Sequence, residues 1–273
     1  MLNIISLGAG VQSTTMALMA AHGEITPMPD AAIFADTQSE PRAVYEHLKW
    51  LMSPNVLPFS VHIVTKGNLG KVTLDVAEGR AKRCDSPPLW IQSQEVNSAA
   101  PISRACTGEY KIKPILKKVD ELCGLKPYQR KPKQPIVNQW IGISTDEVVR
   151  AKKSDRPYII HRWPLIELGM NRTRCISWLK ANDYPVPTKS ACTFCPYKQN
   201  DQWRQLRDRS PEEWAETVEF DRRLRAGGKN WPRTAGPVFL HRDLVPLGEA
   251  KLDGGMNDLW GDMPEECEGM CGV

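Results

Sequence analysis

The chain has 273 residues, 41% of them hydrophobic, and 36 Lys and Arg against 32 Asp and Glu give it a net charge of +4. This length allows one large α/β core with appended loops, and the weakly basic balance fits a phosphate-bearing ligand without requiring nucleic acid. The sequence contains no long apolar run and no signal-peptide pattern, so we expect a cytoplasmic protein without a membrane-spanning helix.

Short apolar segments alternate with helical patterns through the first two thirds of the chain. Strands are expected over 3–7, 31–37, 60–65 and 137–144, and helices over 13–21, 40–52, 69–78, 110–122 and 172–182. Residues 80–105 contain Pro87-Pro88 and are expected to be irregular. Consecutive strand–helix–strand units predict an α/β fold with a mostly parallel sheet and helices on both faces.

The C-terminal part has a different character. Ser210, Pro211 and Glu213 predict a helix start with a capping box, and Gly227-Gly228 is the expected stop. The chain after this helix is rich in loop-forming residues. We therefore expect a nucleotide-binding domain over 1–205, followed by a helical and loop-rich extension with a Cys-containing tail over 206–273.

Small residues lie at and after the end of the first predicted strand. Ser6 is near the end of the strand, and the stretch Gly8-Ala9-Gly10-Val11-Gln12-Ser13 follows it. At a strand-to-helix turn, such residues let backbone N–H groups and the helix N-terminus approach an anion. The ending of a Walker A loop and the third glycine of the dinucleotide fingerprint are both absent. The turn therefore indicates a different phosphate site, or a tight turn without a ligand.

Polar residues also follow two other predicted strands. Asp36 and Thr37 lie at the end of the second predicted strand and Glu40 follows it. The stretch from Gly142 to Glu147, with Arg150 after it, begins at the end of the strand over 137–144. Ligands of open α/β sheets bind at the carboxyl ends of strands, and Arg can bind phosphate through two hydrogen bonds. The alternatives are a turn-capping Asp36 and a surface Arg150.

Among the eight cysteines, Cys192 and Cys195 have the C-x-x-C spacing that suits a metal ion or an iron–sulfur cluster. Cys106 is the candidate third thiolate, whereas Cys175 is expected to be a buried helix residue. A zinc site, or a redox disulfide between Cys192 and Cys195, remains open. Cys267 lies in an acidic tail, and its acidic neighbours disfavour a reactive thiolate.

Taken in this order, the motifs resemble the PAPS reductase family of PP-loop proteins. The stretch from Gly8 to Ser13 is similar to the loop Ser-Gly-Gly-x-Asp-Ser, with Gly8 in place of the first Ser and Gln12 in place of the Asp. That Asp is typical of members that split ATP into AMP and pyrophosphate, whereas Gly-Val-Gln is similar to the Gly-Ile-Gln of some PAPS reductases. Asp36-Thr37-Gln38 is similar to the family's Asp-Thr-Gly.

The resemblance extends to the later motifs. The stretch from Gly142 to Arg150 is similar to Gly-x-Arg-x-x-Glu/Gln-Ser-x-x-Arg, with Ser144 in place of the first Arg. Cys106 falls on the first cysteine of a Cys-Cys pair that helps to hold a 4Fe–4S cluster in APS reductases, and Thr107 replaces the second.

The resemblance implies a set of roles. It implies that an adenine nucleotide (ATP, APS or PAPS) binds at Ser6, Gly8, Ala9, Gly10, Gln12, Ser13, Asp36, Thr37, Glu40, Gly142, Glu147 and Arg150. It implies a 4Fe–4S cluster on Cys106, Cys192 and Cys195, with zinc as the alternative, and a nucleophilic Cys267 that works with a thioredoxin-like donor.

Three functions are compatible with these roles. The first is reduction of adenylyl sulfate or phosphoadenylyl sulfate. The second is ATP-dependent, AMP-forming sulfur transfer to a nucleobase or another acceptor, and the third is a non-catalytic nucleotide-binding module. The loop from Lys126 to Lys133 carries four Lys and Arg and is either a solvated surface or a contact for nucleic acid.

Overall fold

The computed structural model describes residues 1–82, 86–93, 98–231 and 236–253. None of the helices in these ranges is long and apolar enough to cross a membrane.

The chain forms two compact units. Residues 1–66 and 107–191 belong to the first unit, and the described residues of 67–106 and 192–265 belong to the second. The second unit thus takes residues from both sides of the boundary at 205 that the sequence predicts.

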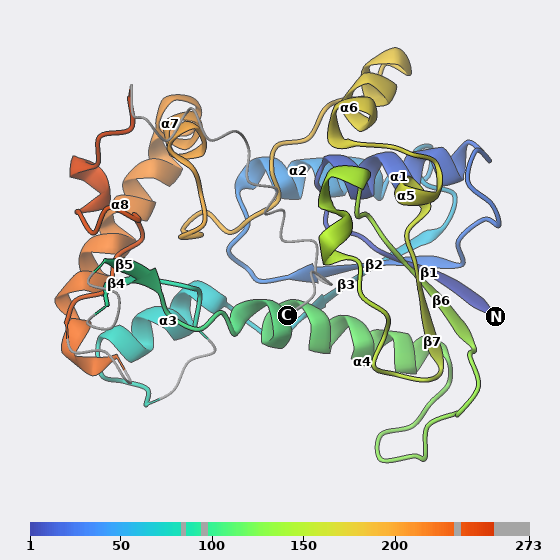
Figure 1. The fold of residues 1–273 in the computed structure, drawn as a ribbon, viewed down its shortest axis with the longest axis horizontal. Coiled ribbons are helices and arrows are strands. Elements are labelled where there is room, and N and C mark those ends of the chain that lie inside the picture. The colour runs from blue at the N-terminus through green and yellow to red at the C-terminus, as the bar shows by residue number, and fades with distance from the viewer. Residues whose placement is uncertain (83–85, 94–97, 232–235, 254–273) are drawn as a thin grey trace. The chain divides into compact units, whose positions relative to one another are not determined.

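The first unit is built on a five-stranded sheet in the order β3-β2-β1-β6-β7, and all of its neighbouring strands are parallel (Figure 1). The strands are β1 (Leu2–Ser6), β2 (Ala31–Asp36), β3 (Ser60–Thr65), β6 (Val137–Ile141) and β7 (Ile159–Arg162). This arrangement confirms the predicted α/β class with a parallel sheet. The strand β7 is absent from the sequence prediction, because a four-residue strand with an exposed Ile160 gives too short an apolar signal.

Helices cover both faces of this sheet, as Figure 1 shows. On one face lie α1 (Val11–Ala21), α2 (Arg42–Leu51), α5 (Pro164–Glu167) and α6 (Arg172–Ala181), and on the other lies α4 (Lys113–Leu122). Successive strand residues supply the two cores, since side chains alternate across a sheet. Ile5 and Phe34 pack toward α1 and α2, whereas Ile4 and Ile33 pack toward α4.

The helix predicted over 110–122 starts earlier and has two parts. A π-helical segment, Thr107–Ile112, leads directly into α4. Pro114 stands in the first turn of α4, where the missing backbone N–H has little effect. The predicted buried position of Cys175 on α6 is confirmed, because this residue is fully enclosed in the core.

The second unit is mainly helical. Its elements are α3 (Leu69–Ala77), β4 (Trp90–Gln92), β5 (Ala99–Pro101), α7 (Asn200–Arg209), α8 (Pro211–Ala226) and two short 3-10 turns at Gly228–Asn230 and Leu247–Glu249. The expectation that residues 80–105 are wholly irregular is wrong, because β4 and β5 form an antiparallel hairpin there. A further bridge joins Trp90 of this hairpin to Phe239.

The predicted capping box at Ser210 is also wrong. Helix α8 does begin at Pro211, but the Ser210 side chain makes no capping hydrogen bond. Ser210 directly follows α7, and its backbone N–H donates to Leu206 at 3.0 Å, so its conformation is set by the end of one helix and the start of the next. The capping box occurs instead at the start of α7, between Gln199 and Gln202.

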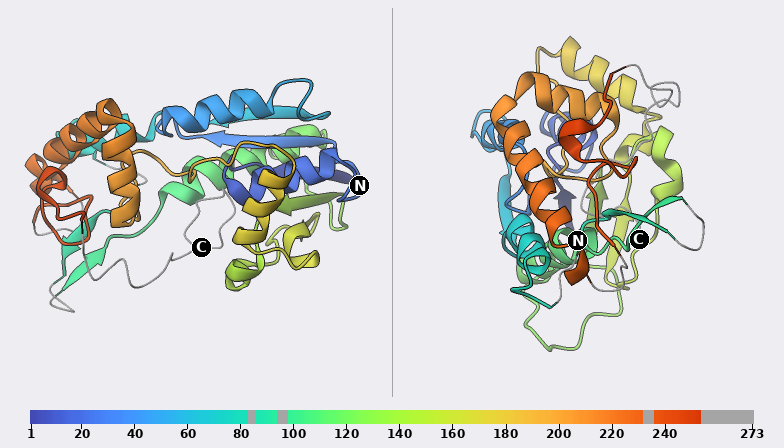
Figure 2. Two further views of the ribbon diagram at one scale, coloured as in Figure 1. Left: turned by 90° about the horizontal axis from the view of Figure 1, so that it is seen from above. Right: turned by 90° about the vertical axis from the view of Figure 1, so that its left-hand side faces the viewer.

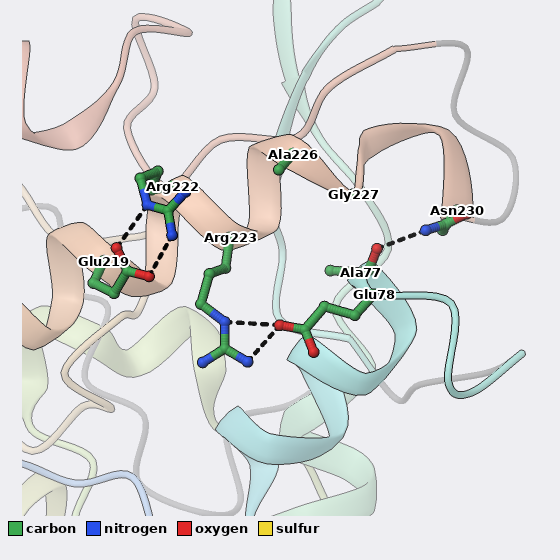
Figure 3. Close-up of a pocket in the computed structure, with 8 residues that line it drawn as sticks. All are labelled: Ala77, Glu78, Glu219, Arg222, Arg223, Ala226, Gly227 and Asn230. Atoms are coloured by element: carbon green, nitrogen blue, oxygen red, sulfur yellow. Dashed lines mark hydrogen bonds and ion pairs between the residues drawn. The ribbon is translucent and has the colours of Figure 1, made fainter.

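Helices α3 and α8 approach each other closely where both end (Figure 3). A Cβ atom added to Gly227 would lie 1.9 Å from the carbonyl oxygen of Ala77. Asn230 donates its side-chain amide to the same carbonyl oxygen at 2.7 Å, and Arg223 donates to Glu78 at 2.7 Å. Glycine is therefore required at position 227 because the backbone of Ala77 lies too close to admit a side chain. Its φ of −91° is not the reason, since any residue can adopt that angle.

We predict that Gly227→Ala destabilises the second unit by about 3 kcal/mol or more, because backbone must move to admit the methyl group. Urea denaturation measures the change. Gly108→Ala is the matched control, since its added Cβ would meet nothing within 4 Å, and it should change the free energy of unfolding by at most about 0.5 kcal/mol. Equal stability of the two variants would contradict the proposed close approach.

Candidate functional site

The first unit has a topological switch point between its neighbouring strands β1 and β6. Helix α1, which follows β1, lies on one face of the sheet, and α4, which precedes β6, lies on the other. Ligands of open α/β sheets bind outside the carboxyl ends of the strands at such a point. The predicted segments at Gly8–Ser13 and Gly142–Arg150 directly follow these two strands, so the fold brings both to this position.

The glycine turn after β1 has the geometry of an anion site. Gly10 is the N-cap of α1, the first turn of that helix carries no acidic residue, and the first intrahelical hydrogen bond runs from Thr14 N–H to Gly10 at 3.0 Å. The backbone N–H groups before Thr14 at the start of the helix therefore have no acceptor within the helix itself. The Ser13 hydroxyl accepts the N–H of Gly8 at 3.2 Å and holds the turn closed.

Two non-glycine residues in the candidate site have left-handed backbone. Ala9 in the turn after β1 and Gln38 after β2 both have φ of 55°, a region that favours glycine. Both residues stand where the motifs of the PP-loop resemblance have glycine.

The buried side chain of Gln12 connects three segments of the site. Its amide nitrogen donates to Glu147 at 3.3 Å and to Ser144 at 3.4 Å. Its amide oxygen accepts from Arg172, at the start of α6, at 3.0 Å. The residue that replaces the PP-loop aspartate is therefore held by the segment after β6 and by α6. Arg172 is a site residue that the sequence prediction missed, because nothing local links it to the glycine turn.

Glu147 is the buried carboxylate of this group. Burial raises its pKa, while the neighbouring guanidinium groups of Arg150 and Arg172 act in the opposite direction. Arg150 forms an ion pair with Glu147, and Ser144 donates its hydroxyl to Asp146. The predicted residues Glu147 and Arg150 thus lie together, and Arg150 acts at least in part by balancing the charge of Glu147.

Asp36 and Thr37 lie at the carboxyl end of β2. Asp36 accepts hydrogen bonds from the Gln38 N–H at 2.7 Å and from the Tyr45 hydroxyl at 2.8 Å. Burial, together with the bond to Asp36, raises the pKa of Tyr45, so Tyr45 stays a neutral donor at physiological pH. Thr37 donates to Glu40 at 3.3 Å.

A buried ion pair joins this corner to the π-helical segment that precedes α4. The side chain of Glu40 has no exposed surface, and one of its oxygens lies 3.1 Å from the Lys111 ammonium group, whose side chain is 7% exposed. The other carboxylate oxygen, Oε2, is buried without a hydrogen-bond partner. Burying a charge pair costs desolvation energy that only good geometry repays, so this pair adds little to stability. Lys111 is not among the site residues that the sequence predicts.

Ser6 has a different place from the one predicted. Its hydroxyl is buried and accepts from the Gln139 amide at 2.8 Å. This bond joins β1 to β6 within the sheet, so Ser6 connects the two strands that carry the site. Gly142 is buried at the carboxyl end of β6, on the same edge as the glycine turn.

The three candidate metal ligands Cys106, Cys192 and Cys195 all belong to the second unit, and none of them is in a disulfide. The Cys195 N–H donates to Cys192 at 3.0 Å, which closes a turn of the kind that presents two thiolates to one ion. The guanidinium of Arg104, two residues before Cys106, lies over the Tyr197 ring at 5.4 Å.

Within the described ranges, however, no group of three or more His, Cys, Asp or Glu is arranged to hold a metal ion. The three-thiolate site therefore stays a prediction. Cys267 lies outside the described residues, as does the rest of the predicted Cys-containing tail.

A separate cavity of about 610 Å³ lies in the second unit between the ends of α3 and α8 (Figure 3). The charged side chains that line it are already paired, Glu78 with Arg223 and Glu219 with Arg222. It offers a ligand no uncompensated charge, and we assign it no function.

Comparison with known proteins adds little to this geometry. No model of a protein family matches the chain, and no curated protein matches it. Among solved structures, the chain is similar to phosphoadenylyl-sulfate (PAPS) reductase from Candida auris in a phosphate complex. The two are 11% identical, the match covers 68% of this chain and 74% of the other, and the TM-score is 0.41. Because this score is below 0.5, we draw no conclusion from the likeness.

We predict that Gln12→Asp makes stability depend on pH, because it places a second carboxylate beside Glu147. Like charges at this distance raise the pKa of one partner further. A carboxyl group with a raised folded-state pKa stabilises the protein at low pH and loses that effect as the pH rises. The free energy of unfolding of the variant should therefore fall below that of the parent protein by an amount that grows to about 3 kcal/mol between about pH 5 and pH 8.

Denaturant titrations at several pH values measure this difference. The double variant Gln12→Asp/Glu147→Gln has one carboxylate fewer and should lose the pH dependence. If the difference in free energy of unfolding between Gln12→Asp and the parent protein were the same at every pH, residue 12 and Glu147 would not interact.

Proposed function

We propose that this chain is an enzyme that binds an adenine nucleotide at the glycine turn after β1 and reduces adenylyl sulfate or phosphoadenylyl sulfate. The proposal takes the nucleotide site from the switch point between β1 and β6, and the reaction from the resemblance of the motifs to the PAPS reductase family.

The observation that carries the proposal is the position of the Gln12 side chain. An amide is a weak ligand for Mg²⁺, which prefers carboxylate and phosphate oxygens. Here both ends of the amide are occupied by Glu147, Ser144 and Arg172. The loop therefore offers no carboxylate at the position typical of ATP-cleaving relatives, which favours a nucleotide whose reaction does not depend on that carboxylate.

The left-handed backbone of Ala9 and Gln38 also supports the proposal. Each adopts a conformation suited to glycine, although its side chain costs on the order of 1 kcal/mol there. The turns after β1 and β2 thus both keep a backbone conformation that suits glycine, which supports a requirement for the backbone of these turns to approach a ligand closely.

In the proposed reaction, the Cys267 thiolate attacks the sulfur of the sulfate group and forms an S–S bond. The S–O bond breaks, and the adenylate leaves with its electron pair. A thiol of a thioredoxin-like donor then attacks the Cys267 sulfur, which releases sulfite and leaves a mixed disulfide. A second donor thiol resolves this disulfide, so the donor supplies the two electrons that reduce the sulfate group.

The first unit contributes binding and charge balance to this reaction. The N–H groups of the glycine turn and the dipole of α1 stabilise the phosphate, and Ser13 is placed to donate its hydroxyl, which otherwise points toward Gly10 at 3.5 Å. Lys111 and Glu40 form a buried polar corner at the carboxyl end of β2.

The proposed cofactor is a 4Fe–4S cluster on Cys106, Cys192 and Cys195, with zinc as the alternative. The turn from Cys192 to Cys195 fits such a ligand pair. Within the described residues, the three cysteines are not arranged as a group that could hold a metal ion, so we assign the cluster no step in the reaction.

The alternative function is AMP-forming sulfur transfer to a nucleobase or another acceptor. The segment of residues 111–180 favours it in one respect, since its 16 Lys and Arg against six Asp and Glu suit a large anionic acceptor. The amide at position 12 disfavours it.

We predict that Ser13→Ala lowers the affinity for adenosine 3′,5′-bisphosphate by about tenfold, the usual effect of losing one hydrogen bond to a charged group. Gly10→Val should abolish binding, because its side chain would block the approach of phosphate to the turn. Titration calorimetry measures both effects.

Thr15→Ala is the matched control. Its hydroxyl lies on the same helix but donates to Val11 at 2.8 Å within that helix. The control should bind the nucleotide as the parent protein does. If Gly10→Val and Ser13→Ala kept both the parent thermal stability and the parent affinity, the glycine turn could not be the nucleotide site.

A further inference from the structure

A basic surface lies at the amino ends of the parallel strands β6 and β7, whereas the glycine turn lies at the carboxyl end of β1. It consists of the end of α4, the loop over residues 124–135 and the loop over residues 151–157, both of which run toward the start of a strand. This surface is defined by five exposed side chains: Lys117, Lys126, Arg130, Lys133 and Lys153. Figures 1 and 2 show the loop after α4 reaching away from the sheet.

The charge of this surface is not balanced locally. None of the five defining side chains forms an ion pair within the described part of the chain. The loops over residues 124–135 and 151–157 carry seven Lys and Arg against one acidic residue, Asp155, although the whole chain has a net charge of only +4. This local excess of positive charge creates a potential that attracts polyanions.

Asp120 fixes the two loops next to each other. It accepts from Lys131 at 2.9 Å in one loop and from Arg156 at 3.2 Å in the other. The Tyr158 hydroxyl, at the end of the second loop, also donates to Asp120 at 2.7 Å. One half-buried carboxylate therefore pairs with two of the cations, whereas the five defining side chains are exposed.

The tip of the first loop presents an aromatic ring. Tyr128 is 107% exposed and has a φ of 62°. A non-glycine residue in left-handed backbone costs about 1–2 kcal/mol, and an exposed ring gains nothing from burial. Backbone strain that presents an aromatic side chain to solvent between Lys126 and Arg130 is a reason to look for a ligand.

We propose that this basic surface binds single-stranded nucleic acid, with the cations on its phosphodiester backbone and a base stacked on Tyr128. Cationic tracks with exposed aromatic rings are how proteins bind single strands without reading sequence. The contact is independent of the proposed reductase activity, because it uses none of the residues at the glycine turn.

The test measures fluorescence anisotropy of labelled oligonucleotides of about 20 residues with the full chain. The probes are oligo(U), oligo(dT) and a DNA duplex, each at about 50 and 200 mM salt. We expect a single strand to bind best, with affinity that falls as salt rises. Tighter binding of oligo(U) identifies RNA, and tighter binding of oligo(dT) identifies DNA.

Variants show whether the basic surface is responsible. Lys126→Ala/Arg130→Ala/Lys133→Ala should lower the affinity at low salt by at least about tenfold and reduce the slope of log K against log salt by about 2, since each lost contact with a single strand accounts for about 0.7. The control Lys49→Ala/Lys180→Ala/Arg209→Ala removes the same charge from exposed positions on α2, α6 and α7 and should bind as the parent protein does.

Tyr128→Ala should weaken binding by at least about fivefold, and Tyr128→Phe should not, because stacking needs only the ring. The proposal is overturned if the loop variant and the control lose equal affinity, or if the duplex binds best. It is also overturned if the protein binds phosphatidylserine vesicles but none of the oligonucleotides.

Discussion

The hydrogen bonds of the Gln12 amide hold the candidate site together. They join the turn after β1 to Glu147, which follows β6, and to Arg172 at the start of α6. The order of the strands along the sheet reverses between β1 and β6, so one neutral side chain connects the two segments that follow these strands. An aspartate here would face the buried Glu147 carboxylate. The identity of residue 12 and the chemistry that the turn supports are therefore linked.

A second constraint is the burial of charge at the same edge of the sheet. Glu40 and Lys111 form an ion pair with almost no solvent exposure, and one Glu40 oxygen has no partner. Such a pair stabilises a fold less than apolar side chains of similar volume would. The pair lies at the carboxyl end of β2, beside Asp36 and Thr37, which is the corner where the sequence predicts nucleotide-binding residues. The hydrophobic cores on both faces of the sheet supply the stability that this corner costs.

The elements that the sequence predicts best are those with strong local patterns. The strand at Ser60–Thr65 is predicted to the residue, and β1, β2 and α3 within one or two residues, because apolar runs and turn residues mark them. The strand β7 and the β4–β5 hairpin are too short to leave such a pattern. The site is less predictable, since Gln12 and Glu147 are 135 residues apart and no local rule pairs them. Lys111 is recognisable only once the fold places it beside Glu40.

We propose that the glycine turn serves reduction of an adenylyl sulfate and not cleavage of ATP. The most direct test incubates the anaerobically purified protein with adenylyl sulfate or phosphoadenylyl sulfate and reduced thioredoxin, and in parallel with ATP and Mg²⁺. Sulfite, pyrophosphate and AMP are measured. We expect sulfite from one of the sulfates and no pyrophosphate from ATP. Release of AMP and pyrophosphate from ATP, without sulfite from either sulfate, would contradict it.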